Sequence, residues 1–541
     1  MEESDMPHAT DAALKIAAKN IASYGDTDIF PFPTENHIFF DKPKEISALL
    51  RDIDKDFAGS LVKMPVLTSK ELAAAGYSGF RQGTQIDPIW NAYLLALVAT
   101  IGEDIEARRV SSNIVFSYRY RPDRNSGALF DKSVGWLQFQ AAAKLNAETH
   151  AYVLRCDISD FYPRIYHHRL ENALRRATEK ADIVNRIRDL VSAIAAGPSY
   201  GLPVGGPAAR LLSELLLNSV DRLLIAEGIN FIRFVDDYLI FAESREQAHS
   251  ALIRLSELLL TNEGLSLQKN KTRILSAREF LATSDFAEAP DGESTDDAEA
   301  RTFRRLRIHY DPYSPTAAED YETLADELSK FDIVGMLGRE LAKSRIDEGL
   351  TRRLVIAIKL LPAASQNDAM RSMLDSLDLL YPIFPSVMQL CRSLLPNLEP
   401  NVQATLYKAL RELIQGDSYI TQVRANLAFA LRVLATDSSE ETELLFATLF
   451  RKTSSMMIRR DLIVLMAHRR ADYWLSNCRT SFATLTGWER RALLIASYTL
   501  GDEGKHWRDS IRDEQSPFDK LVMDWTAESK QKQGPAWRVP L

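Results

Sequence analysis

Short apolar runs bounded by charged residues predict three β-strands in the first half of the chain. Residues 230–233 and 238–241 are rich in Phe, Ile, Leu and Tyr, and a four-residue segment that ends in two adjacent aspartates separates them. Two such runs around a short turn are typical of a β-hairpin. Residues 152–156 form a third run of this kind, which Asp157 follows directly. The chain between this run and the hairpin is long enough for a helical crossover, so we expect the strands to be neighbours in one sheet.

From residue 301 onward the apolar positions recur at helical spacing, with Pro, Gly or Asp-Ser breaks between the segments. The helices expected from this spacing cover residues 354–361, 370–380, 387–395, 402–414, 423–434 and 440–450. Asp87-Pro88 and Ser314-Pro315 each begin a further helix, because a capping side chain followed by a first-turn proline favours a helix start. A train of helices of this length resembles a HEAT-like solenoid, although no strict repeat period is visible.

An acidic stretch divides the chain. Residues 282–300 hold seven acids and no base, and they contain few large apolar side chains. Such a composition favours a surface excursion or linker over a packed element. We therefore expect three parts: residues 1–281 with the strands, the acidic linker 282–300, and an α-helical repeat-like domain over residues 301–541.

Composition excludes several classes of protein. The chain of 541 residues is 46% hydrophobic, enough for about two to four domains with cores. Its three cysteines are far apart, so neither a disulfide framework nor a zinc site is indicated. No stretch approaches the length of a membrane span, and the sequence predicts a soluble, cytoplasmic protein without membrane contact. The net charge of −8 predicts weak nonspecific binding to duplexes, since phosphate contacts call for a basic surface.

Three aspartates carry the candidate chemistry. Asp236 and Asp237 lie at the tip of the expected hairpin, and Asp157 ends the strand expected beside it. Adjacent carboxylates repel each other unless a cation neutralises them, so this arrangement favours a divalent metal with oxygen ligands, Mg²⁺ first and Mn²⁺ as an alternative. A pair of such cations could stabilise the attacking and leaving oxygens of a phosphoryl transfer. The alternative is a solvated turn and an ordinary helix cap.

These residues belong to four segments that resemble, in order, the palm motifs of bacterial reverse transcriptases. The segments are residues 157–165, 201–212, 234–237 and 264–272. The resemblance implies an α+β fold in which fingers and a palm, an antiparallel sheet with helices, precede an all-α helical domain in place of a thumb. It also implies DNA synthesis from dNTPs with a two-metal site.

The resemblance assigns roles to individual residues. Asp157, Asp236 and Asp237 would be the catalytic metal ligands, and Lys271 would place a cation near the departing pyrophosphate. Tyr162 would lie beneath the incoming sugar and favour deoxynucleotides. The expected nucleotide-binding residues are Asp160, Phe161, Tyr162, Gly205 and Arg119.

Two features narrow the resemblance to the abortive-infection (Abi-type) and related phage-defence reverse transcriptases. Residues 24–33 and 314–321 resemble segments of that group, in which a protein tyrosine replaces the primer; the matching residue here is Tyr24. Val204 stands where templated enzymes have a glutamine that helps to hold the nucleotide and the template base. The group therefore implies a single-stranded DNA product attached to the protein, homo-oligomerisation and anti-phage defence.

Three functions remain open from the sequence. The first is a metal-dependent polymerase primed at a tyrosine, with or without a template or a bound RNA. The second is a conventional RNA-templated reverse transcriptase that extends a nucleic-acid primer. The third is an inactive polymerase fold that acts as a scaffold through its helical domain.

Overall fold

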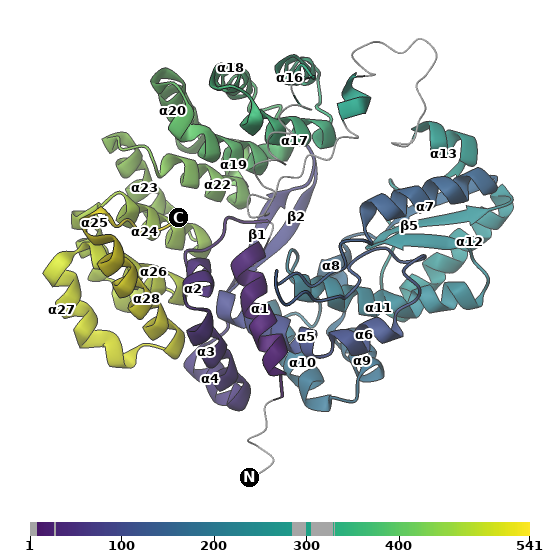
Figure 1. Cartoon of the computed structure of the whole chain (residues 1–541), viewed down its shortest axis with the longest axis horizontal. Helices are drawn as coiled ribbons and strands as arrows, with labels where there is room; N and C mark the ends of the chain where they lie inside the picture. Colours follow the sequence, from purple (N-terminus) through teal and green to yellow (C-terminus); the bar gives the residue numbers. More distant parts are fainter. Residues whose placement is uncertain (1–7, 26, 28, 284–298, 304–327, 329) are drawn as a thin grey trace.

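A four-stranded antiparallel sheet forms the centre of one half of the molecule. The computed structural model describes all residues except 1–7, 26, 28, 284–298, 304–327 and 329 (Figure 1). The strands follow the order β4-β5-β3-β6. Their bounds are β3 (Tyr152–Asp157), β4 (Phe231–Phe234), β5 (Asp237–Ala242) and β6 (Arg273–Ser276).

Helices cover both faces of this sheet. Side chains alternate along a strand, so Val153, Leu239 and Phe241 belong to one apolar cluster while Leu154, Cys156 and Ile240 belong to another. Figure 1 shows α7 and α13 on one face and α11 and α12 on the other. The helices of this half are α5 (Pro88–Thr100), α6 (Gly102–Arg108), α7 (Trp136–Thr149), α8 (Phe161–Arg164), α9 (His167–Ala177), α10 (Ala181–Ala195), α11 (Pro207–Ala226), α12 (Arg245–Leu258) and α13 (Ala277–Thr283).

The predicted hairpin is present, with its strands displaced by one residue. β4 and β5 pair antiparallel, Phe234 opposite Asp237, so the turn consists of Val235 and Asp236. The third predicted strand is β3, which pairs with β5. The helix expected from Asp87-Pro88 is α5, and the Asp87 carboxylate accepts a hydrogen bond from the Ile89 amide.

A second, two-stranded sheet was not expected from the sequence. β1 (Thr68–Ala74) and β2 (Phe80–Ile86) pair along their full length, and Thr68 lies opposite Ile86. This hairpin follows four N-terminal helices. They are α1 (Asp11–Tyr24), α2 (Asn36–Asp41), α3 (Pro43–Lys55) and α4 (Phe57–Lys63).

The described residues beyond 330 form helices, as the periodicity predicts. Those longer than a single turn are α16 (Ile333–Leu341), α17 (Glu348–Ala357), α18 (Ala363–Leu374), α19 (Phe384–Leu394), α20 (Pro400–Gln415), α22 (Arg424–Leu434), α23 (Glu440–Lys452), α24 (Met456–His468), α25 (Asp472–Arg479), α26 (Gly487–Ala496), α27 (Gly501–Ile511) and α28 (Pro517–Gln533). The expected helix at Ser314-Pro315 and nearly all of the acidic linker lie outside the described residues. Within the described ranges, no helix combines the length and the apolar character that crossing a membrane requires.

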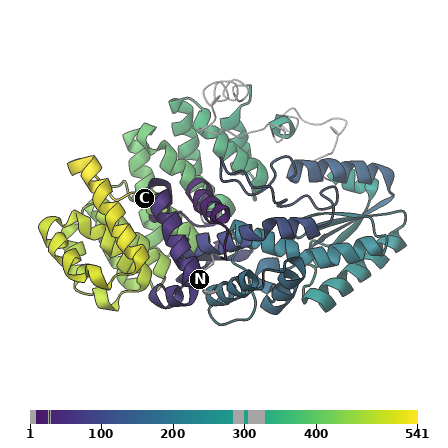
Figure 2. The same cartoon turned by 60° about the horizontal axis from the view of Figure 1, so that its bottom comes forward.

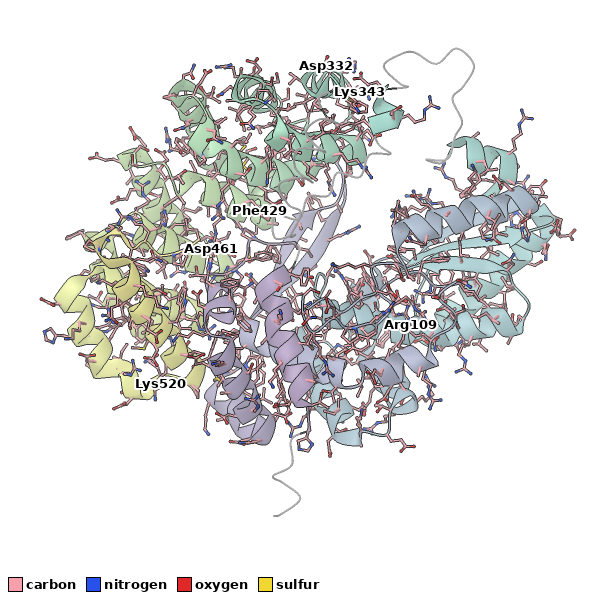
Figure 3. All side chains as sticks on the ribbon, in the orientation of Figure 1. Arg109, Asp332, Lys343, Phe429, Asp461 and Lys520 are labelled. Carbon is pink, nitrogen blue, oxygen red and sulfur yellow. The ribbon has the colours of Figure 1, made fainter. Side chains whose placement is uncertain are left out.

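The N-terminal elements lie between the sheet half and the C-terminal helices (Figures 1 and 2). Trp525 of α28 donates to Asp41 at 2.7 Å, and Arg460 of α24 donates to Gln85 of β2 at 3.0 Å. Asp461, labelled in Figure 3, pairs with Arg432 at 3.2 Å inside the helical array. The described residues between 8 and 100 therefore share a packed boundary with the C-terminal helices as well as with the palm-side elements.

Arg491 of α26 is the most heavily paired ion at this boundary. It is buried, and its guanidinium lies 2.8 Å from Asp87, 2.7 Å from Asp519 and 3.6 Å from Glu35. Burial alone would lower the pKa of Arg491, but the three carboxylates raise it. The three acids come from separate parts of the chain, so one cation joins α5, α28 and the segment before α2.

We expect Arg491→Met to lower the free energy of unfolding by about 3–5 kcal/mol, because it leaves buried carboxylates without their cation. Urea denaturation would measure the change. Arg490→Met is the matched control, since Arg490 is exposed and, among the described residues, its side chain donates only to the Leu485 carbonyl. Equal effects of the two substitutions would contradict the assignment.

Candidate active site

Three carboxylates meet where β3 and the β4–β5 hairpin end. Asp157, the last residue of β3, is the cross-strand partner of Asp237, the first residue of β5. Directly opposed residues of an antiparallel pair have Cβ atoms about 4.5–5.5 Å apart. Asp236 precedes Asp237 in the turn, and its carbonyl accepts a hydrogen bond from the Ile158 amide at 3.2 Å. The sheet register therefore brings together the three acids that the sequence singled out.

Burial and neighbouring negative charges both disfavour the ionised form of these acids. Burial raises the pKa of Asp236 to about 6, with further contributions from Asp157 and Asp237. Burial and Asp157 likewise raise the pKa of Asp237, while Arg155 and Lys271 oppose the shift. In the absence of a divalent cation, Asp236 accordingly keeps its proton up to about pH 6.

Lys271 supplies one positive charge, since its ammonium group donates a hydrogen bond to the Asp157 carboxylate. In the described part of the chain, no group of three or more His, Cys, Asp or Glu side chains is arranged as a cation site. Facing aspartates nevertheless fit Mg²⁺, which commonly takes one or two carboxylates and completes its shell with water and substrate phosphates. The donor set thus suits a metal that arrives with its substrate.

A buried network behind the hairpin fixes the turn that carries Asp236. Val235 has φ of 57°, a left-handed conformation that is unusual for a β-branched residue. Its amide donates to the Ser117 hydroxyl at 2.9 Å, and its carbonyl accepts from Arg233 at 2.6 Å. Ser117 in turn donates to Glu214. Both backbone groups of the strained residue are thereby satisfied.

Arg233 is the centre of this network and is fully buried. It lies 3.0 Å from Glu214 and 2.6 Å from Asp221, both on α11. Burial alone would lower the pKa of Arg233, but these two acids raise it well above its usual value. Arg109, labelled in Figure 3, lies 2.7 Å from Glu214 and adds a second buried cation. The sequence interpretation missed this network, although a glutamate within the apolar run of α11 was a visible signal.

The residues after Asp157 form a short turn of helix. Asp160 is exposed and has φ of 48°, and its carboxylate lies 3.5 Å from Arg164. The Phe161 ring is buried, so only its backbone is available to a ligand. Tyr162 is partly buried against Phe161, and its hydroxyl accepts a hydrogen bond from Ser213 at 3.4 Å. Burial raises the pKa of Tyr162, which keeps the phenol neutral.

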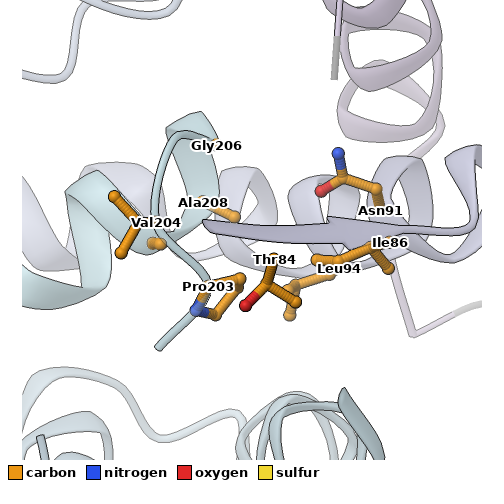
Figure 4. Close-up of a pocket in the computed structure, with 9 residues that line it drawn as sticks. Thr84, Ile86, Asn91, Leu94, Pro203, Val204, Gly206 and Ala208 are labelled. Atoms are coloured by element: carbon orange, nitrogen blue, oxygen red, sulfur yellow. The ribbon is translucent and has the colours of Figure 1, made fainter. Parts of the chain in front are cut away.

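The glycine loop before α11 packs on this segment. Gly201 and Gly205 have φ of 100° and 107°, which other residues rarely adopt. The Leu202 amide donates to the Tyr162 carbonyl at 2.9 Å. Val204 lines a cavity of about 10 Å³ that also contacts Thr84 of β2 (Figure 4), room for about one water molecule. Two of the segments expected to bind nucleotide are therefore held together by backbone hydrogen bonds.

The structure engages Arg119 in contacts within the protein. Its guanidinium lies 2.5 Å from Glu106 and donates to the Val110 carbonyl at 2.9 Å.

Arg81 of β2 is an exposed cation near the acids, and its charge lowers the pKa of Asp236. Beyond the backbone pairing of β2 with β1, its side chain makes no hydrogen bond or ion pair with the residues that the structure describes. The sequence interpretation overlooked Arg81, because it did not predict the hairpin that carries it.

Tyr24, the expected priming residue, ends α1, and its side chain is 48% exposed. Within the described residues, no hydrogen bond, ion pair or ring contact connects it to the three acids. Tyr24 is thus partly exposed, and its assignment as a primer stays a prediction.

The central segment of the chain matches a known protein family. Residues 105–306 match the family described as reverse transcriptase (RNA-dependent DNA polymerase). This segment is less than half of the chain, and it contains Asp157, Asp236 and Asp237. The match shows that this segment is similar to reverse transcriptases, and it supports a nucleotidyltransferase activity.

Solved structures give only distant likenesses. Telomerase from Candida albicans in complex with a fragment of telomeric RNA is 11% identical, with 68% of this chain and 67% of that chain covered and a TM-score of 0.30. Apo telomerase from Candida tropicalis is 9% identical, with 71% and 74% covered and a TM-score of 0.28. No curated protein sequence matches the chain. TM-scores this low add nothing to the assignment.

The raised pKa of Asp236 predicts a pH-dependent stability in metal-free buffer. The folded protein binds this proton up to about pH 6, whereas the ordinary pKa of an aspartate is 3.8. The free energy of unfolding should therefore fall as the pH rises through this interval. Asp236→Asn should reduce the fall and stabilise the protein at neutral pH by about 3 kcal/mol at most.

Urea denaturation at several pH values in the presence of a chelator measures this effect. Asp509→Asn, which removes an exposed acid of α27, is the control and should leave the pH profile unchanged. Parallel profiles for wild type and Asp236→Asn would show that the pKa of Asp236 is not raised in the folded protein.

Proposed function

We propose that this chain is a metal-dependent DNA polymerase that transfers deoxynucleotides from dNTPs to a hydroxyl group. The observation that carries the proposal is the register that places Asp157 opposite Asp237, with Asp236 beside them, inside a segment that matches reverse transcriptases. Acids whose pKa values are raised in the absence of metal are strongly stabilised in their ionised form when divalent cations bind.

The carboxylates of Asp157, Asp236 and Asp237 would hold the cations. A bound pair of Mg²⁺ ions would supply charge stabilisation for the attacking and leaving oxygens of the transfer. The buried network around Arg233 keeps the turn in one conformation, so the carboxylates need little reorganisation on binding. Mn²⁺ has the same preference for oxygen ligands and would serve the same positions.

Cationic side chains would bind the triphosphate. Lys271 lies against Asp157, and bound metal would release its ammonium group toward the departing pyrophosphate. Arg81 of the β1–β2 hairpin is exposed, and its charge lowers the pKa of Asp236. Its guanidinium is therefore better suited to phosphate contacts than that of Arg119. Tyr162 would lie beneath the sugar and select deoxynucleotides. Asp160, Phe161 and Gly205 would contribute backbone contacts.

The finer assignments rest on the sequence resemblance. They are a role in anti-phage defence, homo-oligomerisation, a HEAT-like helical domain in place of a thumb, and a cytoplasmic location. Priming at Tyr24 is supported by the exposure of its side chain. Synthesis without a template is supported by Val204, whose side chain cannot hydrogen-bond to a base or nucleotide. The product would then be single-stranded DNA attached to the protein.

A conventional RNA-templated reverse transcriptase is the second candidate. The matched family is described as an RNA-dependent DNA polymerase, which favours a template. The two candidates differ in what they need: the first adds nucleotides to protein alone, while the second needs an RNA template and a primer terminus.

The first experiment incubates the purified protein with each labelled dNTP and Mg²⁺, with and without primed RNA. We expect incorporation that a chelator abolishes. Asp237→Asn should reduce incorporation by more than roughly 100-fold. Loss of an outer-sphere partner of a metal ligand typically costs about 10- to 100-fold, so loss of a direct ligand should cost more. Asp189→Asn, an exposed acid of α10, should retain full activity. Incorporation that depends on primed RNA favours the second candidate, and no incorporation in either condition would favour an inactive scaffold.

The second experiment tests the priming residue. After incubation with dNTPs, mass spectrometry should find nucleotides on the peptide that contains Tyr24, and Tyr24→Phe should abolish protein labelling. Tyr473→Phe is the control, because Tyr473 of α25 is 92% exposed and lies outside the proposed site. Undiminished labelling in Tyr24→Phe would exclude Tyr24 as the primer while leaving the polymerase assignment intact.

A further inference from the structure

An exposed group of three aromatic side chains lies beside the proposed site. Tyr166 follows α8, Tyr200 precedes the glycine loop, and His168 is in the first turn of α9. The side chains of Tyr166 and Tyr200 are 41% and 50% exposed. The Tyr166 ring centroid lies 6.2 Å from that of Tyr200 and 5.7 Å from that of His168. We call these three side chains the aromatic ledge.

Three segments of the candidate active site converge on the ledge. The backbones of Tyr166 and Tyr200 form an isolated β-bridge. The Gly201 amide donates to the Ile165 carbonyl at 2.8 Å, which ties the glycine loop to the segment that begins at Asp157. The Tyr166 ring also packs on Gly264, at the start of the segment that carries Lys271; a Cβ at that position would lie only 2.9 Å from the ring. The ledge is therefore built into the same framework as the acids.

Positive charge surrounds the ledge. Arg164 precedes Tyr166 by two residues and has a side chain that is 57% exposed, while Arg169 follows His168 in the first turn of α9. Lys70 of β1 lies close enough to lower the pKa of the neighbouring His167. The exposed acid among these residues is Asp160, which lies 3.5 Å from Arg164. Flat exposed rings interleaved with cations are the combination that binds unpaired nucleotides, because bases stack on the rings and phosphates contact the cations.

We infer that the aromatic ledge binds the unpaired bases of single-stranded nucleic acid next to the polymerase site. The inference rests on the proposed function, and it adds a binding surface for the strand that the polymerase synthesises or copies. The planes of the two tyrosine rings meet at 62°, so the rings present separate faces to successive bases. Duplex bases cannot use these faces, since their own neighbours cover them.

The test is fluorescence anisotropy with a labelled oligodeoxythymidylate, in a buffer that contains a chelator and no dNTPs. Tyr166→Ala and Tyr200→Ala should each weaken binding by about tenfold, the effect typical of one stacked base. Tyr166→Phe and Tyr200→Phe keep the rings and should bind like wild type. Tyr473→Ala removes an exposed tyrosine elsewhere and should have no effect. Affinity for a duplex of the same length should not change in any variant.

Several results would overturn the inference. These are unchanged affinity in the Tyr166→Ala/Tyr200→Ala double variant, an equal loss in the phenylalanine variants, or no single-strand binding by wild type. A change in oligomeric state with unchanged affinity would assign the ledge to a protein contact instead. Tyr200→Leu keeps the apolar bulk without the flat ring, so a loss of affinity in a variant with wild-type thermal stability excludes misfolding as the cause. Because the assay needs no catalysis, failure of the polymerase proposal would appear only in the incorporation experiment.

Discussion

The burial of aspartates beside one another is the constraint around which this half of the molecule is built. The register of β3 and β5 forces Asp157 and Asp237 to face each other, and the turn adds Asp236. A fold can keep such a group only if cations offset it or if the backbone leaves the side chains no alternative. Both conditions hold here, through Lys271 on one side of the acids and through the buried network on the other.

The buried network explains why the turn does not relax. Val235 stays in a left-handed conformation that costs of the order of 1–3 kcal/mol, and Ser117 and Arg233 hold its two backbone groups. Arg233 can be buried only because Glu214 and Asp221 neutralise it. Ion pairs with α11 thus maintain the strained conformation of the turn. A substitution of Glu214 or Asp221 would therefore alter the position of the aspartates without changing a residue that contacts them.

The sequence predicted the elements whose signals are local. Paired aspartates between apolar runs located the hairpin to within one residue, and Asp87-Pro88 located the start of α5. It did not predict the β1–β2 hairpin, since that pairing depends on packing against helices hundreds of residues away and the strands are only weakly apolar. Arg81 was missed with it. The sequence offered Arg119 instead, whose alternating aromatic and basic neighbours gave no sign that Glu106 would bind it.

The β1–β2 hairpin joins two distant parts of the protein. At its tip, the Tyr77 hydroxyl donates to the Leu379 carbonyl at 2.6 Å, across 302 positions of sequence. It also accepts a hydrogen bond from the Ile346 amide at 3.2 Å. Arg81 belongs to the same rigid ribbon, a few residues from this anchor. The position of the Arg81 guanidinium therefore depends on contacts between the hairpin and the C-terminal half of the molecule. A chain truncated before that half would lack these contacts, and the segment that matches reverse transcriptases would not hold the hairpin in place by itself.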